Sequence, residues 1–392
     1  MKDESPTKTI SIVKAGDVTF ISRLHRLAAS LETISIYKVN LISIEPRDLP
    51  VSEVYKYNSI KVPIKLRKYS SIFFLPLRVI EGFWRVFRAC LSSKSDLFIA
   101  AGFEDLFLVW IASFFLKANF IYIANELEGD RNRVRNPKLN KRVNKLVIRL
   151  ERLILKKAKY TIAADYERAK VMEDWYGIDK IEVLRNVPNF QDIENKGLIK
   201  SKLNLAESDK VLLYQGIVAP GRGIEVGIKG CAGIESDRIH FVILGFYTEG
   251  YKKKLLKVAE ESNFKNIHFL EPVPWKELLS WTASCDISFV LIENISISYY
   301  LAAPNKLYET IMVNKPYIAS DFPEIRRVHA IANSGIIVDP ENVIAISGAI
   351  KKLLEDQGFY DKCVSNSKIV RKELNWEVEQ NKLFEFVEAS VK

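Results

Sequence analysis

The sequence predicts an α/β protein made of two doubly wound domains, each built on a parallel sheet. Three observations predict this class. The length of 392 residues suits two domains. Short apolar segments alternate with helical patterns along the chain. The stretch 190–205 is polar and loses this periodicity, so we expect domains at 1–195 and 196–370. Hydrophobic residues make up 48% and charged residues 27%, which excludes a chain that is disordered or coiled coil throughout.

The second half alternates most regularly, and its near-continuous apolar strands fit burial on both faces of a parallel sheet. Its expected strands are 211–214, 240–244, 267–270, 287–291, 316–319 and 335–338, and its helices are 223–233, 249–262, 275–284, 305–313 and 342–355. In the first half we expect strands at 9–13, 34–44, 96–100, 119–124, 160–164 and 180–184, with helices at 20–31, 76–91, 104–116, 138–157 and 166–175. A last helical pattern covers 374–391.

The cysteines and the apolar segments indicate a cellular compartment. The 4 cysteines are far apart and form no CxxC motif, which favours a reducing environment. The first residues lack the basic start and long apolar stretch of a signal peptide. The longest apolar run, 106–116, is shorter than the roughly 20 residues that span a bilayer. We therefore expect a cytoplasmic protein, or a peripheral one on the cytosolic face of a membrane.

The positive charge lies in the first half. Residues 1–195 hold 33 lysines and arginines against 23 acids, whereas residues 196–392 hold 25 of each. Bases interleave with Phe, Trp and Leu in two segments, 61–91 and 131–159. Such basic amphipathic segments suit an anionic membrane surface, and a solvated helix face is the plain alternative. We expect no nucleic acid partner, because no RNP, KH, zinc-finger or helix-turn-helix signature occurs.

The first motif is GIVAPGRGIEVG at 216–227, after an expected strand and before an expected helix. Its glycines allow close backbone approach, and a helix N-terminus with Arg222 suits a diphosphate. The glycine spacing is one residue off the dinucleotide fingerprint, and the acid expected about 20 residues later is missing. A plain strand–turn–helix with a surface arginine is the alternative.

The second motif is AAPNKLYETIMVNKPYIASDFPEI at 302–325. Pro304 breaks the loop, and Asn305 is expected to cap a helix. Lys306 falls in the first turn, where the helix dipole favours anions, and this indicates that it serves a ligand. Glu309 lies on the same side and could hold the hydroxyls of a ribose. A surface pair of Lys306 and Glu309 is the alternative.

The sequence lacks the motifs of several known kinds of active site. It contains no GxxxxGK[ST], HExxH, GxSxG or Asp-x-Asp motif, and its 4 histidines form no cluster. We therefore expect no metal site and no cofactor. In the first half, Asn125 and Glu126 directly follow an expected strand, where sites usually lie in such sheets, although a capped loop would look the same.

Together these segments resemble the retaining glycosyltransferases of group 1, or family 4, which have the GT-B fold of two Rossmann-like domains facing each other across a cleft. The resemblance is best over 205–360 and looser at 123–129 and 184–189. It implies that the final segment, 371–392 with Trp376, crosses back to the first domain.

The resemblance also implies a role for each matching residue. Arg222 would neutralise the diphosphate of a nucleotide-sugar donor, and Lys306 would add a second positive charge. Glu126, from the opposite domain, would join them as a catalytic residue. Further donor contacts are implied at Gly216, Gly223, Asn305 and Glu309, with Pro272 and Val273 bordering the base. Asn125 and Asn186 would face the transferred sugar or the acceptor.

The sequence departs from the family pattern at four positions. Ile217 stands where an arginine is common, and Leu301 replaces the first acid of the Glu-x7-Glu pattern. Asn125 replaces a histidine, and Asn314 replaces a glycine in a turn. The lost acid usually handles hydroxyls of the donor sugar, so the sugar stays open.

The implied function is metal-independent, hexosyltransferase-like transfer with retention. A nucleotide-diphosphate sugar would give its sugar to a saccharide acceptor, expected to be lipid-linked, in cell-surface polysaccharide biosynthesis. One alternative is a nucleotide-sugar 2-epimerase. Another is a degenerate GT-B protein that only binds a nucleotide sugar or a partner. Leu301 favours this last alternative, and retention of Arg222, Lys306 and Glu309 opposes it.

Overall fold

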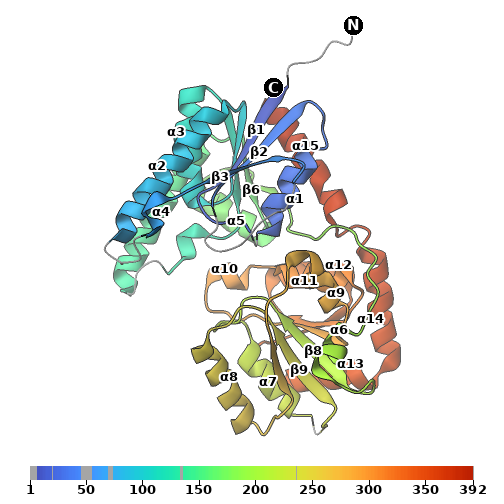
Figure 1. Cartoon of the computed structure of the whole chain (residues 1–392). Coiled ribbons are helices and arrows are strands. Elements are labelled where there is room, and N and C mark those ends of the chain that lie inside the picture. Colours follow the sequence, from blue (N-terminus) through green and yellow to red (C-terminus); the bar gives the residue numbers. More distant parts are fainter. Residues whose placement is uncertain are drawn as a thin grey trace. The chain divides into compact units, whose positions relative to one another are not determined.

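The computed structural model describes residues 7–19, 21–45, 55–68, 74–132, 136–234 and 236–391. Three parts of the sequence predictions lie outside these residues: Phe20, at the start of an expected helix, and 69–73 and 133–135, within the two basic segments. The chain divides into two compact units (Figure 1). Unit 1 is Met1–Arg185 with Gln380–Lys392, and unit 2 is Asn186–Glu379, so the division falls slightly before the predicted stretch 190–205.

The described part of unit 1 forms a seven-stranded sheet of parallel strands in the order β3-β2-β1-β4-β5-β6-β7. Helices α2 and α3 cover one face, and α1 and α15 cover the other (Figure 1). The strands are β1 (Lys8–Lys14), β2 (Tyr37–Ile44), β3 (Asn58–Val62), β4 (Leu97–Ala100), β5 (Asn119–Ala124), β6 (Tyr160–Ala163) and β7 (Glu182–Val183). The helices are α1 (Ser22–Leu31), α2 (Leu75–Ser93), α3 (Phe103–Leu116), α4 (Pro137–Leu155), α5 (Tyr166–Tyr176) and α15 (Trp376–Val391), with short 3-10 turns η1 (Lys65–Lys68) and η3 (Glu128–Asp130).

Within the described residues, unit 2 repeats this architecture with a six-stranded parallel sheet in the order β10-β9-β8-β11-β12-β13. The strands are β8 (Lys210–Gln215), β9 (Ile239–Leu244), β10 (Ile267–Leu270), β11 (Ile287–Val290), β12 (Tyr317–Ser320) and β13 (Gly335–Val338). The helices are α6 (Leu198–Leu203), α7 (Ile224–Ala232), α8 (Glu249–Glu261), α9 (Trp275–Thr282), α10 (Ile297–Tyr300), α11 (Asn305–Met312), α12 (Pro323–Ala332), α13 (Val343–Glu355) and α14 (Gln357–Val370).

The strand order gives each unit a switch point, where successive strands are added on opposite sides. It lies between β1 and β4 in unit 1 and between β8 and β11 in unit 2. Sheets of this kind bind ligands beyond the carboxyl ends of the strands at this point. The predicted fold class of two Rossmann-like parallel-sheet domains is therefore confirmed.

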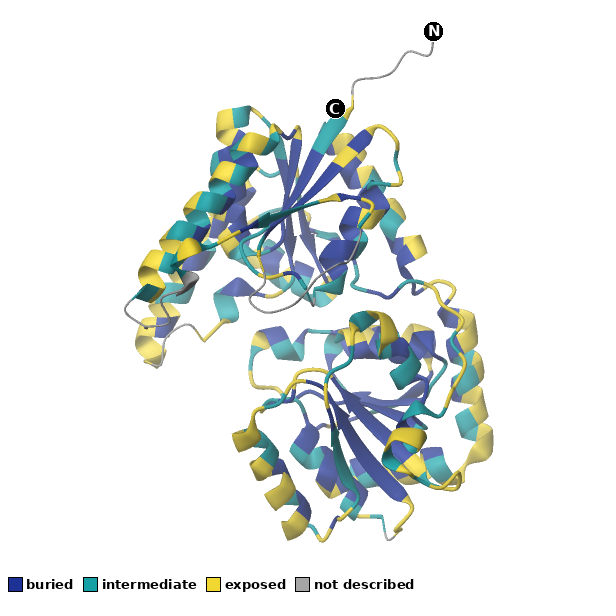
Figure 2. Cartoon of the chain, viewed as in Figure 1, coloured by how far each residue is buried: buried dark blue, intermediate teal, exposed yellow. Residues whose placement is uncertain are grey.

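The core follows from the apolar strands that the sequence analysis singled out. Strands β4, β9, β11 and β12 are buried along their whole length, and they appear dark blue in Figure 2. In unit 2 the rings of Phe241 and Phe289 meet edge to face with centroids 5.3 Å apart. A Cβ at Gly227 would lie 2.7 Å from the Phe289 ring and 3.0 Å from the Phe241 ring, so a glycine lets α7 pack this close to the sheet.

Several elements were not predicted. Strand β3 is a half-buried edge strand that carries a lysine, so it lacks the apolar run used to find the others. Helices α6, α10, α12 and α14 were also missed. Helix α14 begins only one residue after α13 ends, and α10 is four residues long, so neither shows an independent apolar period.

Helix α15 belongs to both units. At its first residue, the backbone N–H of Trp376 donates to the carbonyl of Pro188, within unit 2. At its far end, the carbonyl of Ser390 accepts a hydrogen bond from the side chain of Asn119 at 2.7 Å, within unit 1. Of the final segment 371–392 that the sequence analysis singled out, Gln380–Lys392 are assigned to unit 1.

The segment that leaves unit 1 is held by Arg371, which lies just before α15. The guanidinium of Arg371 donates to the backbone carbonyl of Met312 at 3.2 Å and to the carboxylate of Asp192 at 2.8 Å. Its carbon also lies 5.2 Å from the centroid of the Phe190 ring. The segment 186–192 is therefore held against the rest of unit 2 by Arg371 and Trp376, which lie nearly two hundred positions later in the sequence.

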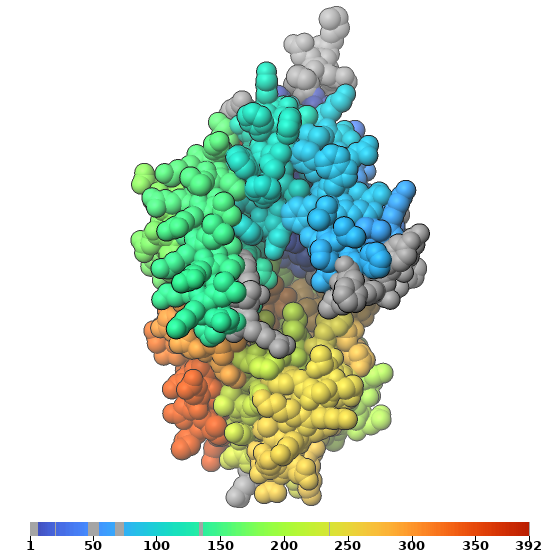
Figure 3. Space-filling view, turned by 90° about the vertical axis from the view of Figure 1, so that its left-hand side faces the viewer, coloured from blue at the N-terminus to red at the C-terminus, as the bar shows by residue number. Residues whose placement is uncertain are grey.

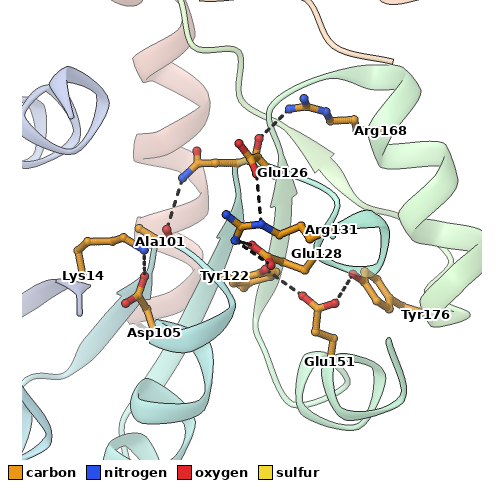
Figure 4. A network of polar contacts seen from close by, with 11 residues as sticks. Lys14, Ala101, Asp105, Tyr122, Glu126, Glu128, Arg131, Glu151, Arg168 and Tyr176 are labelled. Atoms are coloured by element: carbon orange, nitrogen blue, oxygen red, sulfur yellow. Dashed lines mark hydrogen bonds and ion pairs between the residues drawn. The ribbon is translucent and has the colours of Figure 1, made fainter. Parts of the chain in front are cut away.

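A buried carboxylate anchors α4 in unit 1. The side chain of Glu151 is fully buried and accepts hydrogen bonds from the hydroxyls of Tyr122 at 3.1 Å and Tyr176 at 2.6 Å (Figure 4). These tyrosines lie on β5 and α5, so one acid links three elements. A buried charge is costly unless hydrogen bonds stabilise it, and burial together with the Glu151 carboxylate raises the pKa of Tyr122 well above its ordinary value.

We expect Tyr176→Phe to lower the free energy of unfolding by about 1–3 kcal/mol, because it removes a donor from a buried carboxylate. Urea unfolding at neutral pH measures this. The matched control is Tyr247→Phe, whose hydroxyl donates to the exposed Glu271 and should cost less than about 0.5 kcal/mol. Equal losses in the two variants would contradict the anchoring role of Glu151.

Candidate active site

The loop after β8 begins at Gly216, beside the switch point of unit 2. The backbone of Gly216 has φ 121°, and no atom lies within 4 Å of the position that a Cβ would take there. On its other side the loop touches the end of β9, since a Cβ on Gly245 would overlap the carbonyl oxygen of Gly216. The backbone of Gly216 is therefore open to a ligand on one side and tightly packed on the other.

Helix α7 starts directly after this loop. Its N-cap, Gly223, has φ 68°, and a Cβ there would lie 2.5 Å from the Cβ of Leu291, just after β11. A glycine is needed here for both reasons. The first N–H groups of the helix have no partner within the helix, so this end of α7 presents partial positive charge beside Gly216.

Arg222 adds a full positive charge at the same place. Its guanidinium carbon lies 4.7 Å from the centroid of the Tyr299 ring, which orients the group by cation–π attraction. Its Nε atom is buried and has no hydrogen-bond partner among the described residues. The plain alternative, an arginine on the surface of a turn, does not fit these contacts.

Lys306 is the second cation of the site. Only 7% of the residue is exposed, and its Nζ atom lies 3.9 Å from the centroid of the Tyr214 ring. The Nζ atom makes no hydrogen bond within the described part of the chain. Burial and the nearby charge of Arg222 hold the pKa of Lys306 well below its ordinary value, although Glu309 opposes this shift. The alternative of a surface pair with Glu309 is therefore wrong.

Glu309 is held by a relay of side chains that the sequence analysis missed. Its carboxylate accepts a hydrogen bond from the amide of Gln215 at 2.6 Å, and the carbonyl of that amide accepts one from the hydroxyl of Thr282 at 2.6 Å. Gln215 is the last residue of β8, one position beyond the strand that was predicted. A polar residue at the carboxyl end of an apolar strand was the signal that could have identified it.

Asn305 does not cap α11, so this prediction is wrong. Pro304 occupies the N-cap position with an extended backbone, and Asn305 is the first residue inside the helix. The side-chain oxygen of Asn305 instead accepts a hydrogen bond from the amide of Asn186 at 2.9 Å. Two predicted site residues, far apart in the sequence, are therefore brought together within unit 2.

The remaining predicted donor residues lie in the loop between β10 and α9. Pro272 and Val273 are both half-buried, and Val273 packs against a small apolar cluster that includes Leu244 and Leu270. Of the departures from the family pattern, Ile217 is 60% exposed next to Gly216, whereas Leu301 is buried.

The two predicted site residues of unit 1 follow β5. The side-chain oxygen of Asn125 accepts a hydrogen bond from Arg23 at 2.8 Å, and its backbone carbonyl accepts one from Arg168 at 2.7 Å. Glu126 is exposed and lies 3.7 Å from Arg131 (Figure 4). The two arginines that hold Asn125 come from α1 and α5, and nothing in the local sequence indicates that they meet there.

The histidines and acids that the structure describes do not gather into a metal site. Within the residues that the structure describes, no group of three or more His, Cys, Asp or Glu side chains is placed to hold a metal ion. His240 and His268 lie side by side on β9 and β10, with ring nitrogens 3.0 Å apart.

Comparisons with known proteins bear on this arrangement. Residues 195–370 match the family model described as glycosyl transferases group 1. A protein of Escherichia coli (strain K12), named as a colanic acid biosynthesis glycosyl transferase WcaI, is 22% identical over 173 residues. That match covers 43% of this chain and 42% of the relative, so the chain spans less than half of the relative's length.

Two solved structures resemble nearly the whole chain. Sucrose-phosphate synthase from Thermosynechococcus elongatus aligns with a TM-score of 0.81 at 16% identity, covering 97% of this chain and 98% of that one. HepE from Anabaena, in complex with UDP-glucose, aligns with a TM-score of 0.74 at 14% identity, covering 97% and 99%. At these identities the likeness shows the fold.

We expect Gly223→Ala to destabilise the protein by about 1–3 kcal/mol, because it combines a left-handed backbone with a clash against Leu291. Thermal and urea unfolding measure the loss. Gly250→Ala is the control, since that helical position in α8 faces open space and alanine should stabilise it by up to about 1 kcal/mol. A Gly223→Ala protein as stable as wild type would show that the loop is not packed as described.

Proposed function

We propose that the protein transfers a sugar from a nucleotide-diphosphate sugar to a saccharide acceptor. Residues 195–370 match the model of the group 1 glycosyltransferases, and the chain has the GT-B fold. The observation that carries the proposal is the pair of cations Arg222 and Lys306. The Nε atom of Arg222 and the Nζ atom of Lys306 are buried without a hydrogen-bond partner among the described residues, and the charge of Arg222 acts on Lys306.

The chemistry of the step is stabilisation of a leaving group. As the bond from the sugar to the diphosphate breaks, negative charge grows on the phosphate oxygens. Arg222, Lys306 and the N-terminus of α7 are already oriented to receive this charge, so little reorganisation is needed. These cations could do so without a metal ion, and we propose a metal-independent reaction.

The other donor contacts follow the same assignment. Glu309 binds the hydroxyls of the donor ribose, and the Gln215 amide fixes the orientation of that carboxylate. Pro272 and Val273 border the base, while Gly223 and Asn305 contribute through the loop and the first turn of α11. The complexes of HepE with UDP and UDP-glucose support a nucleotide-sugar donor for this fold.

Retention at the anomeric carbon rests on the family resemblance. We propose that the departing phosphate helps to deprotonate the acceptor on the same face of the sugar. Glu126 and Asn125, held in unit 1 by Arg131 and Arg23, are proposed for the sugar or acceptor side together with Asn186. The name of the relative WcaI supports an acceptor in cell-surface polysaccharide biosynthesis, which we propose to be lipid-linked.

Unit 1 carries a surface suited to such an acceptor. Helices α2, α3 and α4 lie next to one another on one face, coloured from light blue through teal to green in Figure 3. Their exposed large apolar residues are Leu75, Leu77, Val79, Ile80, Trp84, Phe107, Phe114, Phe115, Leu139, Leu146, Leu150 and Leu153. Exposed bases accompany them along α4: Lys138, Lys141, Arg142, Lys145, Arg149 and Arg152.

This surface supports a peripheral location on the cytosolic face of an anionic membrane. In the described part of the chain, no helix combines the length and the apolarity needed to cross a bilayer. The sequence analysis indicated two basic segments, 61–91 and 131–159. The exposed aromatic residues of α3 lie on the same surface as the helices of these segments.

The donor site is tested by thermal unfolding against UDP, GDP, dTDP and their sugar conjugates, with EDTA present. A ligand at about 100 times its Kd should stabilise the protein by about 2.7 kcal/mol. We expect one nucleotide class to do so, and Arg222→Ala to abolish the shift, while Lys229→Ala, an exposed position on α7, keeps it. Stabilisation that survives in Arg222→Ala would refute the site, and binding without sugar transfer to any acceptor would indicate a degenerate binding protein.

The membrane surface is tested by flotation with vesicles of anionic or neutral lipid. We expect binding to anionic vesicles that weakens with salt, and a loss of binding in the double variant Phe114→Ser/Phe115→Ser. Ile344→Ser, which changes an equally exposed apolar residue of unit 2, is the control and should float like wild type. Absence of wild-type binding to both vesicle types would refute the membrane proposal and leave the donor site untouched.

A further inference from the structure

The amine of Lys306 makes no ion pair in the described part of the chain, although Glu309 acts on it from one turn along α11. Its Nζ atom is buried, makes no hydrogen bond there and lies 3.9 Å from the centroid of the Tyr214 ring. It is also the second residue of α11, where the helix macrodipole disfavours a cation. Lys14 of unit 1 differs, because its Nζ atom lies 2.9 Å from a carboxylate oxygen of Asp105.

The groups that act on Lys306 come from three places. Burial is the largest influence and disfavours the charge, Arg222 disfavours it from the loop before α7, and Glu309 favours it from one turn along α11. Tyr214 of β8 presents its ring face. Helices α9 and α14 and strands β11 and β12 also pack on α11, and no charged side chain of theirs in the described residues contributes to the shift. The lowered pKa of Lys306 therefore comes from its burial and from Arg222, against the opposing charge of Glu309.

We propose that Lys306 takes up a proton when a nucleoside diphosphate binds, so that the second cation of the site forms only in the bound state. This inference rests on the proposed function and adds how the donor site acquires its charge. The neutral amine uses its lone pair to form an N–H bond with a proton from solvent, and no other bond is made or broken.

The physical reason is the same burial that disfavours the lone charge. A phosphate placed beside a buried amine favours its charged form, and low local polarity strengthens this attraction. Binding therefore raises the pKa of Lys306 from its value in the free protein. A nucleoside monophosphate carries less negative charge than a nucleoside diphosphate and gives less of this gain.

The direction of the pH dependence follows. Between the pKa values of the free and the bound states, affinity falls by about tenfold per pH unit as the pH rises. Below the lower value Lys306 is charged in both states, and this dependence disappears. Stability of the free protein changes in the opposite sense. The unfolded chain binds more protons at this lysine, so the contribution of Lys306 to stability rises with pH up to the ordinary lysine pKa of about 10.4.

The test is to count protons by isothermal calorimetry with whichever of UDP, GDP and dTDP binds most tightly. Titrations at about pH 8, where a terminal phosphate with a pKa of about 6 is already ionised, are repeated in phosphate-free buffers of different ionisation enthalpy. We expect wild type to take up as much as one proton per nucleotide. Lys306→Arg should bind with little or no uptake, and Lys229→Met should behave like wild type.

The outcomes distinguish this inference from the function on which it rests. Nucleotide binding without proton uptake, or with an affinity that stays constant from about pH 7 to about pH 10, overturns the inference alone. Uptake that persists in Lys306→Arg assigns the proton to another group and overturns it too. If none of the three nucleotides binds, the proposed function itself fails. Should Lys306→Arg not fold, as judged by circular dichroism, the wild-type pH series decides.

Discussion

The close contact between Gly216 and Gly245 fixes one side of the loop after β8. Because Gly245 has no side chain, the ends of β8 and β9 approach until the carbonyl of Gly216 fills the space where a Cβ of Gly245 would be. The amide of Gly216 donates to Leu244 from the same place. With the packed side of the loop fixed in this way, its other side is left open, and Gly223 can start α7 against Leu291. The loop, the helix N-terminus and Arg222 all take their positions from this contact.

Charge is distributed differently at the switch points of the two sheets. In unit 1, Lys14 at the end of β1 is paired with the fully buried Asp105, so the two charges largely cancel. In unit 2, the acid near Lys306 is turned toward Gln215, and Thr282 fixes that amide in turn. The two sheets therefore differ in charge at equivalent edges. In unit 1 the two charges form a balanced structural pair, whereas in unit 2 the positive charge is in excess and suits an anionic ligand.

The sequence carries most of the fold and only part of the site. The buried strands of both sheets are apolar enough to identify directly, whereas β3 and α14 are not, because an edge strand and a helix packed directly after another lack a clear period. Arg222, Lys306 and Glu309 stand out through local motifs. Gln215, Thr282 and Arg23 do not, because their roles depend on partners that only the fold brings near. Asn305 was misassigned since Pro304 takes the cap position, a choice decided by the backbone of the preceding loop.

Helix α15 has a consequence for the order in which the protein is made. Unit 1 includes Gln380–Lys392, and its strand β5 uses the carbonyl of Ser390 as a partner for Asn119. When the first 185 residues have left the ribosome, residues 380–392 of unit 1 have therefore not yet been made. Unit 2 is contiguous in the sequence, so all of its residues are made before the segment that completes unit 1. Residues 380–392 thus join a unit whose other residues were all made before any part of unit 2 was made.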